Sequence, residues 1–255
     1  MCSSDLTIYR LSLDLGKVPV VVGDGPGFLV NRILGPYLNE AGFLLSDGAS
    51  IETIDKVAKR FGMPMGPLRL VDEVGIDVSG HAGESLHLAL GERLTPAPAL
   101  LELGRTGRLG KKGGVGFYRY EGGREKGIDP SIYPELPSVP TPGSAPGGPL
   151  AGDEGERVVR RRLVLAMINE AARILGDGIA ASAADVDLAM IMGTGFPPFR
   201  GGLLRFADTL HPRGIVDRLE QLSEEYGPRF EPAPTLVRLA SEDRTLYAAF
   251  PGTRR

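Results

Sequence analysis

The sequence is poor in the residues that build disulfides, metal sites and membrane spans. Its 255 residues include one cysteine, Cys2, and three histidines. A single cysteine excludes an internal disulfide and is typical of a protein from the reducing cytoplasm. No apolar run approaches the ~18 residues that cross a bilayer. The net charge of −3, with lysine and arginine scattered along the chain, predicts no affinity for nucleic acid.

Motifs for cofactors, metals and nucleophiles are also missing. Residues 23–27 follow the pattern Gly-x-Gly-x-Gly, but Phe28 stands where a dinucleotide-binding loop needs its third glycine. His81 and His87 are six residues apart, so they do not share a helix face as paired metal ligands do. No glycine-flanked nucleophilic serine is present either. The residue patterns alone therefore show no catalytic machinery and no metal site.

Near residue 25 the spacing of apolar residues changes from that of a strand to that of a helix. Residues 17–22 are apolar and β-branched and predict a strand. Residues 25–27 form a Gly-Pro-Gly turn, and residues 30–45 then carry an apolar stripe at helical spacing. Asn31 lies on the flank of this helix. Two interpretations of its side chain remain open, namely contact with a ligand and an ordinary surface amide. The strand has no partner of similar quality, so we expect its sheet to lie upstream of residue 1.

Three more helices are predicted before residue 120. One begins after the capping residue Ser50, one spans residues 67–90 and opens with proline, and a short one covers residues 98–107. The loop that closes this unit contains Lys111 and Lys112. Two interpretations of these lysines remain open, namely contact with a phosphate and a solvated basic loop.

A segment rich in proline and glycine divides the chain. Residues 121–153 hold seven prolines and seven glycines in 33 positions, which predicts a linker or an irregular surface wrap. We therefore expect an N-terminal remnant over residues 1–25, a first helical domain over 26–120 and a second over 154–250.

The first six residues stand out from the rest. The sequence Met-Cys-Ser-Ser-Asp-Leu matches the translation of a common sequencing adapter. We therefore expect residues 1–6 to be artefactual and the reading frame to be truncated, with a short polar tail as the alternative.

The second domain repeats the pattern of the first at an offset of 130 residues. The matching pairs are Arg32-Ile33 with Arg162-Leu163, Asn39-Glu40 with Asn169-Glu170, and Asp47-Gly48 with Asp177-Gly178. So many matches in order predict a tandem repeat. Two copies that each bury one face are expected to pack about a pseudo-twofold axis, as the subunits of a C2 dimer do.

The repeat separates residues that serve the fold from residues that serve a site. Asn39 and Glu40 are kept in the second copy, and we expect them to bond to nearby backbone or loops. The stretch over residues 27–32 is not kept, because Arg161 stands where the first copy has Asn31. Any role of the Gly-Pro-Gly turn is therefore specific to the first copy.

Residues 17–32 resemble a junction found in 3-hydroxyacyl-CoA dehydrogenases. In that family the last strand of an NAD-binding domain passes into a helical C-terminal domain. Further similar motifs lie at residues 48–55, 64–67, 75–77 and 110–118. The second copy, through residues 195–202, resembles the extra C-terminal repeat of the multifunctional fatty-acid oxidation α subunit.

The resemblance implies an all-α fold of two tandem domains similar to the C-terminal domain of 6-phosphogluconate dehydrogenase, preceded by one orphan β-strand. It implies oxidation of (S)-3-hydroxyacyl-CoA to 3-ketoacyl-CoA, with hydride passing to NAD. The NAD-binding domain and the family's His-Glu pair are expected upstream, so this chain alone should be inactive and bind no cofactor. The expected partners are acyl-CoA, the missing NAD-binding domain and a thiolase subunit.

The same resemblance assigns the candidate site. The asparagine of the family's Gly-Phe-x-Val-Asn-Arg motif maps to Asn31, which is expected to donate a hydrogen bond near the reacting oxygen. Phe28, Pro64 and Met65 are expected to line the acyl pocket. Two alternatives stay open: a protein that binds acyl-CoA or completes a separate NAD-binding chain, and a purely structural dimerisation module.

Overall fold

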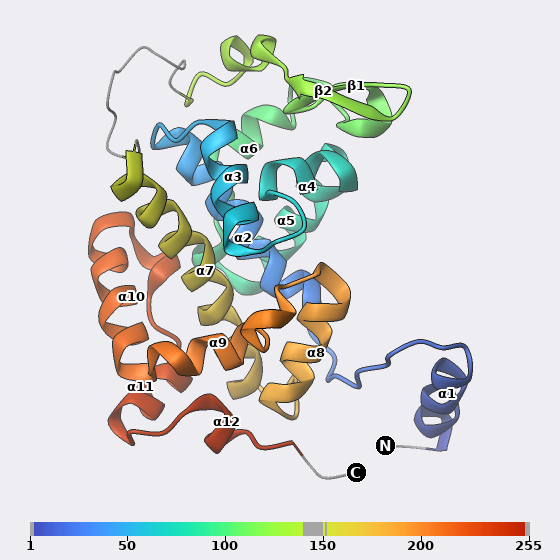
Figure 1. Cartoon of the computed structure of the whole chain (residues 1–255), viewed down its shortest axis with the longest axis vertical. Helices are drawn as coiled ribbons and strands as arrows, with labels where there is room; N and C mark the ends of the chain where they lie inside the picture. The colour runs from blue at the N-terminus through green and yellow to red at the C-terminus, as the bar shows by residue number, and fades with distance from the viewer. Residues whose placement is uncertain (1–2, 140–149, 151, 253–255) are drawn as a thin grey trace.

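The chain folds as two packed helical units, with one small β-hairpin at the edge of the first unit (Figure 1). The computed structural model describes residues 3–139, 150 and 152–252. The expected all-α class is confirmed. Over these residues, every helix is too short or too polar to cross a membrane.

The first unit contains α2 (Val30–Ser46), α3 (Ile51–Phe61), α4 (Pro67–Val74), α5 (Ile76–Leu90), η1 (Glu92–Leu94), α6 (Pro98–Leu103), η2 (Lys111–Gly113), β1 (Tyr118–Glu121), β2 (Arg124–Ile128) and η3 (Pro130–Glu135). The second contains α7 (Gly152–Gly176), α8 (Ala183–Thr194), η4 (Pro198–Arg200), α9 (Leu203–Leu210), α10 (Pro212–Tyr226), η5 (Pro228–Phe230), α11 (Pro234–Ser241) and α12 (Leu246–Ala249). Helix α1 (Ser3–Asp14) precedes both and stands apart from them in Figure 1.

Local sequence signals set several helix ends. The Ser50 hydroxyl accepts a hydrogen bond from the Thr53 N–H at 3.1 Å, which confirms the predicted cap of α3. The long helix predicted over residues 67–90 is divided at Gly75, whose φ of 103° is left-handed. This glycine ends α4 and allows α5 to leave in a new direction.

The strand predicted over residues 17–22 is not formed, which corrects that expectation. Residues 17–25 have no regular structure and lead from α1 to the first unit. The Gly23 N–H donates to the Ile179 carbonyl of the second unit at 2.7 Å. A β-branched segment needs a neighbouring ladder to become a strand, and among the described residues its backbone has one hydrogen bond to the second unit and no ladder.

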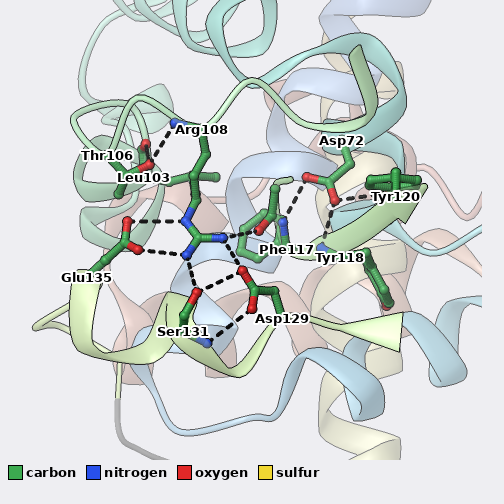
Figure 2. A network of polar contacts seen from close by, with 11 residues as sticks. Asp72, Leu103, Thr106, Arg108, Phe117, Tyr118, Tyr120, Asp129, Ser131 and Glu135 are labelled. Carbon is green, nitrogen blue, oxygen red and sulfur yellow. Dashed lines mark hydrogen bonds and ion pairs between the residues drawn. The ribbon is translucent and has the colours of Figure 1, made fainter. Parts of the chain in front are cut away.

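Part of the predicted linker packs as a wrap over the first unit (Figure 2). The Arg108 guanidinium lies 2.7 Å from Asp129 and 2.7 Å from Glu135, and so fastens the segment after β2. The segment buries three apolar side chains, those of Ile132, Leu136 and Val139. Residues 121–139 therefore belong to the first unit. Residues 140–149 and 151 of the predicted linker lie outside the described residues.

The two units are joined by buried ion pairs that each provides for the other. Arg32 Nε lies 2.7 Å from Glu170 Oε1, and Arg162 Nε lies 2.5 Å from Glu40 Oε1. Because Arg32 corresponds to Arg162 and Glu40 to Glu170, the contact is reciprocal, as across a twofold axis. These residues come from α2 and α7, which pack against each other at the centre of Figure 1.

A second arginine completes each cluster. Arg229 Nε lies 2.8 Å from Glu40 Oε2, and Arg93 Nη2 lies 3.3 Å from Glu170 Oε1. Burial raises the pKa of the Glu40 carboxyl, and the charges of Arg162 and Arg229 act in the opposite direction. Each buried carboxylate is thus neutralised by two arginines of the other unit.

The kept asparagines serve the fold, as the repeat predicts. Asn39 Oδ1 accepts from the Ala97 N–H at 2.7 Å, and Asn169 Oδ1 accepts from the Ala233 N–H at 2.8 Å. Each amide also donates to a carbonyl of the same loop. The expectation that these residues bond to loop backbone is therefore confirmed.

Removing one arginine of a reciprocal pair should strongly destabilise the chain. In Arg162→Met, the Glu40 carboxylate stays buried with one of its two partners lost. We expect the free energy of unfolding to fall by roughly 3–5 kcal/mol in urea titrations. Arg238→Met is the matched control, because Arg238 forms an exposed pair with Glu242 and should change stability by about 0–1 kcal/mol. Equal effects of the two variants would contradict the central role of Arg162.

Candidate functional site

The corner before α2 has a constrained backbone. Gly27 has φ of 70°, and a Cβ there would lie 2.9 Å from the Arg32 nitrogen and 3.0 Å from Leu86 Cδ2. Only glycine fits this position. Phe28 follows with φ of 51°, an unusual conformation for a bulky residue, and its side chain is 57% exposed. The corner thus holds an aromatic ring out from the body of the chain.

Asn31 is exposed in the first turn of α2. Its side chain makes no hydrogen bond or ion pair with any residue between 3 and 139, at 150 or between 152 and 252. The next residue, Arg32, is buried and bound to Glu170 and Asp177 of the second unit. The amide is therefore carried on a firmly held backbone while its donor and acceptor remain available to a ligand.

The second unit reaches the same corner, which the sequence did not reveal. A methyl group on Gly193 of α8 would lie 3.2 Å from Val30 Cγ2. A methyl group on Gly25 would lie 2.8 Å from Ile179 Cδ1. The sequence feature that could have predicted this contact is the expected pseudo-twofold packing, because it places the second copy beside the corner of the first copy. It does not say which residues of α8 touch the corner.

Pro64 and Met65 lie on the turn between α3 and α4. Pro64 is exposed and Met65 is half-buried. A methyl group on Gly195, at the end of α8, would lie 2.9 Å from Pro64 Cγ. The turn with Pro64 and the start of α2 therefore both border the C-terminal end of α8, one at Gly195 and the other at Gly193. Of the four predicted residues, the structure brings Pro64 against this end of α8, and within the described residues no hydrogen bond joins Phe28, Asn31, Pro64 and Met65.

Asp55 fixes the turn that carries Pro64 and Met65. Its carboxylate accepts from the Leu68 and Arg69 N–H groups at 2.9 and 3.0 Å and from the Tyr118 hydroxyl at 2.7 Å. It thereby caps α4 from outside that helix. Burial raises the pKa of Asp55 to about 6, against the effect of these three hydrogen bonds.

The two lysines of the closing loop are paired with carboxylates. Lys111 Nζ lies 2.8 Å from Glu73, and Lys112 Nζ lies 2.6 Å from Asp77. These pairs satisfy the lysine charges within the chain and favour the partly exposed basic loop over a phosphate contact. The described residues contain no cluster of histidine, cysteine, aspartate and glutamate that would hold a metal ion.

The glycines over residues 23–27 do not fit a nicotinamide dinucleotide. Their close contacts are taken up by the chain itself, with Ile179 against Gly23 and Gly25 and with Leu86 against Gly27. A phosphate-binding loop also needs a strand before it, and residues 17–25 form none. This turn positions α2 and is not a cofactor cradle.

Comparison with known proteins gives two matches to one family description, "3-hydroxyacyl-CoA dehydrogenase, C-terminal domain", at residues 27–120 and 158–251. The chain is 45% identical over 237 residues to a fatty acid oxidation complex subunit alpha from Shewanella sp. (strain ANA-3) and 43% identical over 233 residues to one from Shewanella loihica. In both cases the match covers 91% of this chain and 32% of the relative. The chain thus spans about a third of these relatives.

Solved structures agree with these matches. A 3-hydroxybutyryl-CoA dehydrogenase from Escherichia coli K12 superposes with a TM-score of 0.73 at 26% identity, covering 93% of this chain and 64% of that one. The dehydrogenase part of multifunctional enzyme 1 from C. elegans superposes with a TM-score of 0.63 at 26% identity, covering 91% and 52%. The double match to one family description also confirms the tandem repeat.

Asp55→Asn should change how stability depends on pH. Burial raises the pKa of Asp55 from its ordinary 3.8 to about 6, so between these values the folded chain binds more protons than the unfolded chain. Stability is therefore lost as the pH rises through this window, by up to ~3 kcal/mol for a shift of about two units. This pH-dependent part of the free energy of unfolding should be absent in Asp55→Asn.

Urea titrations across the same pH window measure the effect. Asp217→Asn, an exposed change on α10, is the control and should follow the wild-type profile. A pH profile of Asp55→Asn parallel to that of the wild type would show that Asp55 is not the responsible group.

Proposed function

The chain belongs to the 3-hydroxyacyl-CoA dehydrogenase family, and on this basis we propose that it is the substrate-side part of an NAD-dependent dehydrogenase of fatty-acid β-oxidation. The intact enzyme would oxidise an (S)-3-hydroxyacyl-CoA to the 3-ketoacyl-CoA. The observation that carries the proposal is the free Asn31 amide on a rigid, exposed corner. The names of the relatives support the substrate class.

In this proposal Asn31 holds the reacting oxygen of the substrate. Its amide donates a hydrogen bond to the oxygen on which negative charge develops, and the packed backbone of Arg32 keeps the donor in place. A preorganised donor of this kind contributes typically ~10²–10³ in rate. The exposed Phe28 ring, Pro64 and the half-buried Met65 offer apolar surface for the acyl chain.

The acid–base group and the NAD site would lie outside this chain. His81 and His87 are bonded to carbonyls of α5 and its cap, at 2.7 and 3.2 Å, and in the part of the chain that the structure describes neither is hydrogen-bonded to Asn31. We propose that an NAD-binding domain, joined in cis or in trans, supplies both groups. We also propose a cytoplasmic location and, from the relatives' description as complex subunits, association of the intact protein with a thiolase.

Two exposed surfaces support a missing partner domain. The first is apolar and runs from α1 into the following segment, through Ile8, Leu11, Leu15, Val18 and Val21. The second is α5, which packs on α2 through Leu86 and leaves most of its length exposed. Exposed apolar surface of this extent is typical of a face that another domain covers.

The purified chain should form no NADH from NAD and a 3-hydroxyacyl-CoA, because it lacks the base and the cofactor site. Turnover by the chain alone, followed at the absorbance of NADH, would overturn the proposal. Calorimetric titration with acyl-CoA tests the alternative of an acyl-CoA-binding protein, which requires binding heat without the partner domain.

Asn31→Ala tests the role of the amide in a full-length protein that contains this domain. We expect kcat to fall about 10²–10³-fold, because a hydrogen bond to the reacting oxygen is lost. Asn39→Ala on the same helix is the matched control. It removes the loop contact to Ala97 and should lower the melting temperature while leaving kcat of the folded enzyme unchanged. An unchanged kcat in Asn31→Ala would favour the structural dimerisation module.

Alanine substitutions on α5 test whether that face is covered. A Cβ at Gly80 or Gly83 meets no atom within 4 Å, so each Gly→Ala change should stabilise the isolated chain by about 1 kcal/mol. Gly42→Ala in α2 is the control and should destabilise, because its Cβ would lie 2.7 Å from Leu100 Cγ. In the full-length protein, a domain that covers α5 would contact the added methyl group. The same change at Gly80 or Gly83 should then lower the stability.

A further inference from the structure

A hollow of about 250 Å³ opens where α3, the first half of α7 and η4 meet. Its apolar lining comes from Val57 and Phe61. Its charged lining consists of Arg60, Arg157, Arg160, Arg200, Asp153 and Glu156. Four arginines against two carboxylates leave a formal charge of +2. The hollow is therefore basic although the chain as a whole is acidic.

Two of these arginines have carboxylate partners. Arg60 Nη1 lies 2.6 Å from Glu156, and Arg157 Nη1 lies 2.7 Å from Glu154. Arg160 and Arg200 form no ion pair with any residue that the structure describes. Two guanidinium groups therefore share one hollow without the counter-ions that usually accompany arginine side chains.

Arg200 is held firmly in this position. Its Nε donates to the Phe61 carbonyl at 3.0 Å, and its guanidinium lies 4.1 Å from the centroid of the Phe61 ring. Burial, followed by the positive charge of Arg160, lowers the pKa of Arg200. The two arginines thus feel each other's charge, and an anion between them would relieve that repulsion.

The hollow is the second copy's counterpart of the corner at the start of α2. Arg160 and Arg161 occupy the positions of Val30 and Asn31 in the repeat. In the first copy the neutral Val30 packs against Gly193 of α8. In the second copy Arg160 lines a hollow with residues of α3, the helix that corresponds to α8. The same place in the fold has changed from neutral to strongly basic.

An exposed aromatic ring lies next to this basic group. The Phe199 side chain is 75% exposed, and the Arg200 guanidinium lies 5.3 Å from its ring centroid. Arginine forms paired hydrogen bonds with phosphate, and an exposed aromatic ring offers a stacking surface for a base. Arginines beside an aromatic platform are a combination suited to nucleotides.

We propose that this hollow binds a nucleotide with at least two phosphate groups, with Arg160 and Arg200 on the phosphates and Phe199 against the base. The site involves neither Asn31 nor the corner before α2, so it goes beyond the proposed dehydrogenase function. A free nucleoside diphosphate and the phosphoadenosine end of coenzyme A share the required chemistry.

Calorimetric titration of the whole chain with ADP, coenzyme A and tripolyphosphate tests the proposal. We expect ADP or coenzyme A to bind, and Arg160→Gln and Arg200→Gln each to weaken binding by at least about tenfold. Phe199→Ala should weaken binding of the nucleotides but not of tripolyphosphate. Arg218→Gln is the matched control, because Arg218 is exposed on α10 and, in the described part of the chain, is bonded to the Gly214 carbonyl alone. Its affinity should equal that of the wild type.

Circular dichroism melts check that each variant is folded. If Arg200→Gln unfolds, Arg200→Lys keeps the positive charge and should retain partial binding. Absence of heat with ADP and coenzyme A into the millimolar range would overturn the site, as would unchanged affinity in both arginine variants. Equal affinity for tripolyphosphate and the nucleotides would overturn the contact of Phe199 with the base. Preference for ADP or for coenzyme A identifies the source of the phosphates.

Discussion

The fold depends on two buried carboxylates, Glu40 and Glu170, that each accept an arginine from the other copy. Removing charged groups from water costs several kcal/mol per ion, so such pairs contribute more to specificity than to net stability. Any other alignment of α2 against α7 would leave Arg32 and Arg162 buried without partners. The reciprocal pairs therefore fix one register between the two copies.

This register also places the candidate site. Arg32 and Asn31 are neighbours in sequence but have opposite environments, since Arg32 points into the second copy and binds Glu170 while Asn31 stays exposed. The ion pair therefore fixes the backbone that carries the free amide. The end of α8, from Gly193 to Gly195, reaches Val30 and Pro64 only because the copies meet in this register. The second copy is thus part of the site's construction, although it carries no matching asparagine.

Sequence periodicity predicted the helices and the cap Ser50, because these depend on neighbours along the chain. The internal repeat predicted the structural role of Asn39 and Glu40 for a similar reason, since two copies must share what the fold needs. The strand over residues 17–22 was wrong because strand formation depends on a partner that local sequence does not contain. The sequence left open whether residues 121–153 form a linker or a surface wrap, because their high proline and glycine content masks the contacts that Arg108 makes with Asp129 and Glu135.

The contrast between Asn31 and Arg161 shows where the copies were free to diverge. Residues in the reciprocal ion pairs and the loop contacts of Asn39 and Asn169 are kept, because a change in any one of them leaves a buried partner without its contact. The turn before α2 has no such constraint in the second copy, where α7 instead continues as one long helix through Val159. Arginines are tolerated there because Arg160 remains exposed. The corner of the second copy is thus basic where the corner of the first copy is neutral, so the two copies present surfaces suited to ligands of different charge.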